Sequence, residues 1–129
     1  MRKRILIVDD EEDLTWSVVK GLTKDNLEVL SAHSGSIALD LLAKHRIHLL
    51  VTDIRMPGIN GLELVSRVQS LFPNVKIILM TAFSSPEIND FIRRFGVFGF
   101  MEKPFEINAL RQLINQGLKH STSSLSSHP

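Results

Sequence analysis

Five polar side chains in this sequence have the chemical types that metal binding and phosphoryl transfer require. Asp9, Asp10 and Asp53 offer carboxylates, Thr81 offers a hydroxyl and Lys103 offers an ammonium group. Three carboxylates that share a pocket repel one another unless a cation lies between them, and oxygen ligands in a chain without cysteine favour Mg²⁺. A carboxylate beside that cation is a competent nucleophile for an aspartyl phosphate, and the other two groups can bind phosphoryl oxygens. If these side chains meet, they predict phosphoryl transfer.

Each of these residues also has an ordinary structural interpretation. A single Asp after a strand is commonly a turn residue or a helix cap, a single Thr is commonly a strand-end or turn residue, and a single Lys is usually a solvated surface charge. The chemical interpretation therefore depends on whether the fold brings all five to one place.

Short apolar segments predict the strands that would do so. Their near-continuous Ile, Leu and Val content is typical of strands buried on both faces, as in a parallel sheet. The five polar side chains follow the ends of four of these strands, and the carboxyl ends of parallel strands are where chemistry gathers in an open sheet. The predicted strands are Arg4 to Val8, Leu27 to Ser31, His48 to Thr52, Lys76 to Met80 and Val97 to Met101.

Between the strands the apolar residues recur at helical spacing. Ser34 and Ser84 are predicted N-caps, the latter with Glu87 three residues later as in a capping box. Strands and helices alternate throughout, which predicts an α/β fold: a doubly wound (βα)5 parallel sheet in a three-layer sandwich. The predicted helices are Asp13 to Lys24, Ser34 to Lys44, Leu62 to Phe72, Ile88 to Phe95 and Phe105 to Leu118.

Length and composition narrow the class of protein. The chain has 129 residues, which suits one domain, and we expect it to occupy residues 1–118 with a disordered Ser-rich tail or linker over 119–129. Fifteen basic and fourteen acidic side chains nearly cancel, so the overall charge indicates neither nucleic acid nor a membrane as partner. The absence of cysteine and the short apolar run from Ile5 to Val8 predict a soluble, cytoplasmic protein.

Four motifs resemble the receiver domains of two-component response regulators. They are Asp9-Asp10 after the first strand, "TDIRMPGINGLEL" around Asp53, "MTA" ending at Ala82 and "EKPF" from Glu102 to Phe105. The resemblance covers roughly residues 3–118 and implies a flavodoxin-like fold with strand order 2-1-3-4-5. It also implies that Asp53 accepts a phosphoryl group from the phosphohistidine of a sensor histidine kinase or a phosphotransfer protein.

The resemblance assigns a role to each acid. Asp10 and Asp53 would ligate Mg²⁺ directly, with the backbone carbonyl of Arg55 as a third ligand, while Asp9 would act mainly through bound water. Gly61, eight residues after Asp53, would permit a close approach of the backbone before the next helix.

The resemblance also implies how phosphorylation changes the protein. Thr81 and Lys103 would hold the phosphoryl oxygens, and the Lys103–Pro104 bond would be cis. Thr81 would then move toward the phosphate while Phe100 turns inward; the alternative for Phe100 is a permanently buried core residue. The fourth helix, fifth strand and fifth helix would form the surface for partner binding or a homodimer.

Three other functions are compatible with parts of this sequence. A small phosphatase that works through an aspartyl phosphate would need an acid two residues after the nucleophile, where this chain has Arg55, so we do not expect a conventional enzyme. A receiver-like scaffold that never takes phosphate is disfavoured because the acids, Thr81 and Lys103 are all present. The remaining alternative is the N-terminal regulatory part of a multidomain DNA-binding transcription regulator. We expect no direct nucleic-acid binding by this chain, because no recognition helix fits in the Ser-rich tail.

Overall fold

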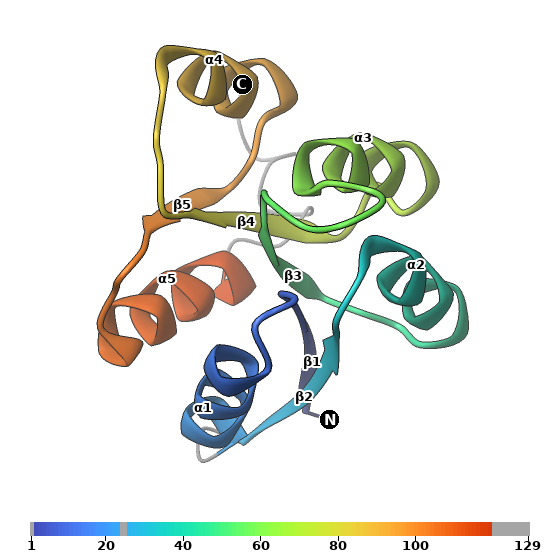
Figure 1. Cartoon of the computed structure of the whole chain (residues 1–129). Coiled ribbons are helices and arrows are strands. Elements are labelled where there is room, and N and C mark those ends of the chain that lie inside the picture. The colour runs from blue at the N-terminus through green and yellow to red at the C-terminus, as the bar shows by residue number, and fades with distance from the viewer. Residues whose placement is uncertain (1, 24–25, 120–129) are drawn as a thin grey trace, which may run out of the picture.

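A parallel five-stranded sheet forms the centre of the molecule (Figure 1). The computed structural model describes residues 2–23 and 26–119. Within them the strand order is β2-β1-β3-β4-β5, and every neighbouring pair runs parallel, as predicted. The strands are β1 (Lys3–Val8), β2 (Leu27–Ala32), β3 (Leu49–Asp53), β4 (Lys76–Thr81) and β5 (Gly99–Glu102).

Helices cover both faces of this sheet, which confirms the three-layer arrangement (Figure 1). α1 and α5 bury Val18, Leu22, Leu110 and Ile114 against one face of β1, β3 and β4. On the other face lie α2, α3 and α4, with α4 contributing only partly buried side chains. The helices are α1 (Glu12–Thr23), α2 (Gly35–Lys44), α3 (Gly61–Leu71), α4 (Pro86–Phe95) and α5 (Ile107–Lys119).

The middle strands are apolar on both sides because both of their faces are covered. All five residues of β3 are buried, and Ile5 to Val8 of β1 are at most 1% exposed. Each Å² of apolar surface that these strands remove from water stabilises the fold by about 25 cal/mol. They fix the positions from which the polar residues at the carboxyl edge project.

Several strand ends differ from the prediction. β3 extends through Asp53, since the Ile54 amide still donates to the Met80 carbonyl at 3.1 Å, and β4 extends through Thr81, which pairs with Glu102 of β5. β5 begins at Gly99, two residues later than predicted. The reason is that the Val97 amide donates to the Ile92 carbonyl and so closes the end of α4.

One predicted helix cap is correct and one is wrong. The Ser34 hydroxyl accepts a hydrogen bond from the Ile37 amide, as expected for an N-cap. At α4 the N-cap is Ser85, which accepts from the Ile88 amide at 3.2 Å, and not Ser84. Proline at the first helical position keeps the preceding residue in an extended conformation, which is the conformation an N-cap needs. The predicted capping box with Glu87 is therefore absent.

Two further predictions concern the tail of the chain and its relation to membranes. Almost all of the predicted tail, residues 120–129, lies outside the described residues. None of the helices in residues 2–23 and 26–119 has both the length and the apolar character that crossing a bilayer requires.

Candidate functional site

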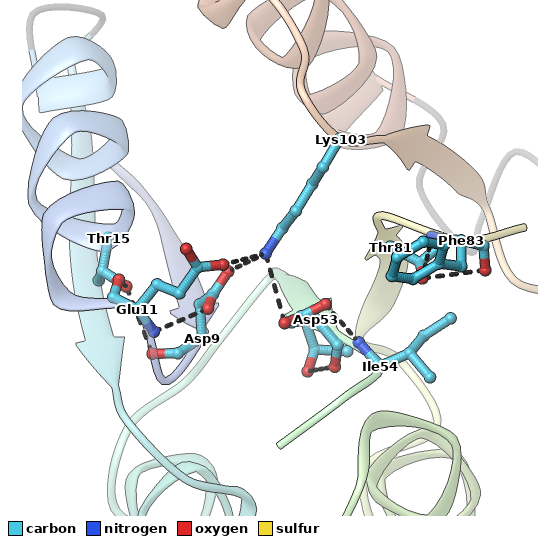
Figure 2. Close-up of polar contacts among 9 residues, drawn as sticks. Asp9, Glu11, Thr15, Asp53, Ile54, Thr81, Phe83 and Lys103 are labelled. Carbon is cyan, nitrogen blue, oxygen red and sulfur yellow. Dashed lines mark hydrogen bonds and ion pairs between the residues drawn. The ribbon is translucent and has the colours of Figure 1, made fainter.

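The predicted site residues lie at the carboxyl edge of the sheet. Asp53 is the last residue of β3, and Thr81 is the last residue of β4. Asp9 directly follows β1, and Lys103 directly follows β5. These residues are far apart in sequence, but they lie at one edge of the sheet because parallel strands end on the same side (Figure 2).

Three carboxylates meet at this edge. One oxygen from each of Asp9, Asp10 and Asp53 lies within 4.8 Å of the other two. Asp9 is fully buried and Asp53 is 7% exposed, whereas Asp10 is exposed. The Asp9 and Asp53 side chains are oriented by backbone amides, because Asp9 accepts from Glu11 N and Asp53 accepts from Ile54 N, each at 2.9 Å.

Lys103 extends its ammonium group among these acids (Figure 2). Its Nζ lies 2.7 Å from Asp9 Oδ2, 3.3 Å from Asp53 Oδ2 and 3.2 Å from Glu11 Oε1. The Lys103–Pro104 peptide bond is cis. Glu11 was not predicted as a site residue, and it directly precedes α1, which begins at Glu12. The signal that could have found it is its position two residues after Asp9, where a turn returns its side chain toward the pocket.

Burial and charge set the protonation behaviour of the two central groups. Burial raises the pKa of Asp53 above its usual value, opposed by the Lys103 charge and reinforced by the Asp9 charge. Burial acts to lower the pKa of Lys103, but the hydrogen bond to Asp9 and the charges of Asp53 and Asp9 outweigh it and raise that pKa. The ammonium form of Lys103 is therefore held firmly, while the charge on Asp53 is costly.

The donor set fits a hard divalent cation. All three clustered groups are carboxylates, one of them exposed enough to leave room for water on the ion, which is the environment that Mg²⁺ prefers. Two buried carboxylates against one ammonium group also leave an excess of negative charge. Arg55, whose carbonyl was expected to complete the ligand set, lies exposed in the loop after β3.

Thr81 makes a local turn rather than pointing to the acids. Its Oγ1 accepts from the Phe83 amide at 3.1 Å and lies 3.2 Å from the Phe83 carbonyl oxygen (Figure 2). In the sheet register Asp53 pairs with Met80, so Thr81 lies one position beyond the acceptor on the adjacent strand. Phe83 is 62% exposed, and the Arg55 guanidinium carbon lies 5.0 Å from the centroid of its ring.

Gly61 explains how α3 can start directly beneath Asp53. A Cβ atom at this position would lie 2.1 Å from the Asp53 carbonyl oxygen, which no real side chain tolerates. The Gly61 amide also donates to the Ile54 carbonyl at 2.8 Å. The close approach expected from the sequence is present, and it fixes the backbone that carries Asp53.

Phe100 lies in β5 opposite Leu79 and packs, partly buried, against the core beneath α2, α3 and α4. This position agrees with both interpretations of Phe100. The neighbouring Gly99 is pressed against α5, since a Cβ there would lie 2.8 Å from Leu113 Cδ2.

Comparison with known proteins identifies the family. Residues 5–115 match the response regulator receiver domain. The chain belongs to this family. Its flavodoxin-like strand order is that of the CheY-like receiver from Methanospirillum hungatei, with a TM-score of 0.88, 29% identity and coverage of 92% of this chain and 95% of that one. TrrA from Thermotoga maritima, solved in complex with Mg²⁺ and BeF, aligns with a TM-score of 0.81 at 30% identity over 90% of this chain and 99% of that one.

Curated relatives of this receiver domain fall into two size classes. Sporulation initiation phosphotransferase F of Bacillus subtilis is 29% identical over 92% of this chain and 95% of its own length. The DNA-binding transcriptional regulator NtrC of Klebsiella pneumoniae is 32% identical over 88% of this chain, which spans 24% of that protein. The family thus includes both single receivers and receivers that are part of a larger transcription regulator.

Proposed function

We propose that this receiver domain is a phosphorylation-dependent signalling switch whose phosphoacceptor is Asp53. The single observation that carries the proposal is the placement of this carboxylate, 7% exposed, against Lys103 and within 4.8 Å of two further acids. An Asp53 oxygen attacks the phosphorus of a phosphohistidine on a sensor histidine kinase or phosphotransfer protein. The new bond is P–O, the P–N bond breaks, and its electron pair leaves on the imidazole nitrogen.

Magnesium is the cofactor of this proposal. Asp10 and Asp53 would hold the ion directly with the Arg55 carbonyl, and Asp9 would hold it through water. When bound, Mg²⁺ neutralises phosphoryl charge beside Asp53. The support is the oxygen-only donor set and the excess negative charge of the cluster.

Lys103 and Thr81 provide the remaining contacts to the phosphoryl group. The Lys103 ammonium already lies 3.3 Å from Asp53 Oδ2, so it is positioned to pair with the added dianion. Thr81 would exchange its present contact with the Phe83 backbone for a phosphoryl oxygen. The space it leaves would be filled by Phe100, and the surface of α4, β5 and α5 would change for a partner or a second copy of the chain.

The protein assists its own phosphorylation and dephosphorylation in this scheme, and is not a conventional enzyme that turns over a free substrate. Its place of action would be the cytoplasm, where sensor kinases present their phosphohistidine.

The decisive experiment is incubation with acetyl phosphate and Mg²⁺ followed by intact mass. The native chain should gain the mass of one phosphoryl group, and the gain should be absent with EDTA. Asp53→Asn should gain none, while Asp40→Asn, an exposed acid on α2, should label like the native chain. Equal labelling of Asp53→Asn would overturn the assignment.

A second candidate is that the domain is the regulatory part of a transcription regulator. The observation that favours it is the 32% identity to NtrC, a protein about four times longer than the matched region. The coding sequence downstream of residue 129 distinguishes the two, because the second candidate requires a DNA-binding domain there.

A further inference from the structure

A second concave site lies at the opposite edge of the sheet from Asp53. It is a cavity of about 480 Å³ between the amino ends of β1, β3 and β4 and the end of α5. The volume falls in the range of small-molecule sites, about 300 to 1,000 Å³. The cavity lies at the amino ends of the strands, whereas the phosphoacceptor site lies at their carboxyl ends. The two sites therefore share no residue.

Basic side chains line this cavity and acidic side chains do not. Lys3 and Lys76 begin β1 and β4, and His48 directly precedes β3, so three adjacent strands each place a nitrogen-bearing residue at the same edge. Arg46 and His45 add two more from the loop after α2. In the described part of the chain, no carboxylate lies within ion-pair distance of Lys3, Arg46 or Lys76.

Not every basic residue at this edge of the sheet lacks a carboxylate partner. Arg4, one residue after Lys3, has its guanidinium 3.1 Å from the Glu28 carboxylate and is thus neutralised. Among the described residues, Lys3, Arg46 and Lys76 have no such carboxylate partner, and the Lys76 ammonium lies 5.4 Å from the centroid of the Phe98 ring. Their field reaches His48, since burial and then the charges of Lys3 and Arg46 lower the pKa of that imidazole. Positive potential is therefore concentrated at the cavity.

Apolar residues line the cavity together with the basic ones. They include Leu42, Phe72, Val75 and Leu118. A ligand that fits must therefore combine an anionic head with an apolar body.

We propose that this cavity, lined by Lys3, Arg46, Lys76 and His48, binds a small organic anion of the phosphate-ester class with an apolar body. A dianionic phosphate can pair with several cations that have no carboxylate partner, which a single carboxylate does less well. The apolar body lies against Phe72 and Leu118. The site is independent of the proposed phosphorylation of Asp53, so either can fail without the other.

The test uses phenyl phosphate as the probe and the whole ¹⁵N-labelled chain. EDTA is present and Mg²⁺ is omitted, so that the acids at the carboxyl edge repel the probe. Saturable shifts are expected at the amides of Ile47, Val75 and Leu118, and none at Asp53 or Lys103. The imidazole of His48 should titrate at higher pH with the probe bound, because the phosphate offsets the charges of Lys3 and Arg46.

Matched variants distinguish a built site from general attraction. The double variant Arg46→Gln, Lys76→Gln should bind at least about tenfold more weakly, as loss of charge-assisted hydrogen bonds requires. The control double variant Lys20→Gln, Arg67→Gln removes the same charge from α1 and α3 and should bind like the native chain. Phenol, the neutral body alone, should bind at least about tenfold more weakly than the probe.

Three results would overturn the proposal. They are the absence of saturable shifts at the cavity, equal weakening in the two double variants, and phenol binding as tightly as phenyl phosphate. The amide spectrum of each variant reports whether it is folded, so lost binding can be separated from lost structure.

Discussion

Lys103 Nζ lies 2.7 Å from Asp9 Oδ2, although the two residues are 94 positions apart in the chain. The Asp9 side chain is fully buried and that of Lys103 is only 12% exposed. This ion pair joins the end of β5 to the end of β1 across the intervening strands. The stability of the sheet and the chemistry of the site therefore depend on the same contact.

Removing the ammonium group should destabilise the protein strongly. Lys103→Gln leaves Asp9 buried beside Asp53 without a cation, and breaking one side of a buried pair typically costs about 3 to 5 kcal/mol. We expect the lower part of that range, about 3 kcal/mol, because Lys103 is partly accessible to water and one of its partners, Glu11, is exposed. Urea unfolding in EDTA measures the change, and Lys103→Arg, which keeps the charge, should lose much less. Equal losses for both variants would show that charge is unimportant here.

Asp53→Asn should stabilise the metal-free protein. Burial raises the pKa of Asp53, so the ionised carboxylate costs folding free energy at neutral pH. A raised folded-state pKa means that the folded protein takes up the proton more readily, so acidification favours the folded state through this group. The advantage of Asp53→Asn should thus be full at neutral pH and shrink as pH falls through that pKa toward the ordinary value of 3.8. Urea unfolding in EDTA across this range measures it; a variant less stable than the native chain at neutral pH would contradict the prediction.

Mg²⁺ should stabilise the fold through Asp10. A ligand that binds only the folded state, at tenfold excess over its Kd, adds about 1.4 kcal/mol to the free energy of unfolding. Asp10 is exposed, so Asp10→Asn should fold normally and lose this increment. Thermal unfolding with MgCl₂, compared with KCl at the same ionic strength, measures the difference. Asp40→Asn is the control and should keep the increment; if Asp10→Asn keeps it too, Asp10 is not a ligand.

The convergence of the site could be predicted because it follows from the parallel direction of the strands. Once β1, β3, β4 and β5 are parallel, the residues at their carboxyl ends must share an edge. The alternation of apolar strands and helices indicates that direction. The strand order and the close approach of Gly61 to the Asp53 carbonyl were expected only from the resemblance to receiver domains.

Local competition between hydrogen bonds could not be read from the pattern. Thr81 bonds to the Phe83 backbone, and Glu11, which was not predicted as a site residue, pairs with Lys103. The N-cap of α4 shifted from Ser84 to Ser85 because adjacent serines compete and Pro86 decides between them. Each outcome depends on side-chain conformations that differ by small free energies, while the residue types permit either choice.

His48 should make stability depend on pH near neutrality. Its Nδ1 accepts from the Arg4 amide at 3.0 Å, and burial together with Lys3 and Arg46 lowers its pKa below the ordinary 6.5. The unfolded chain therefore binds the proton first, and stability should fall as pH drops through about 6.5. His48→Asn keeps an acceptor without the titration, so this part of the pH dependence should disappear. His45→Asn, an exposed neighbour, should keep it. Urea unfolding at a series of pH values provides the measurement.

The Arg55–Phe83 pair should set the lifetime of the phosphorylated state. Arg55 and Phe83 lie two residues after Asp53 and Thr81, and the guanidinium lies 5.0 Å from the ring centroid. We expect this pair to cover one approach of water to a phosphoryl group on Asp53. If the proposed phosphorylation occurs, Phe83→Ala should lose phosphate several-fold faster, because water enters where the ring was. The decay of the phosphorylated mass after removal of acetyl phosphate measures this rate.

Trp16→Ala is the matched control for that rate. Trp16 is 63% exposed, almost the same as Phe83, and Lys20 lies 4.6 Å from its ring centroid in an equivalent cation–π contact. It projects from α1, and we expect its removal to leave the lifetime unchanged. Acceleration in both variants would indicate general loosening of the fold, whereas acceleration in Phe83→Ala alone identifies shielding at the acceptor. An unchanged lifetime in Phe83→Ala would mean that the ring does not limit the access of water.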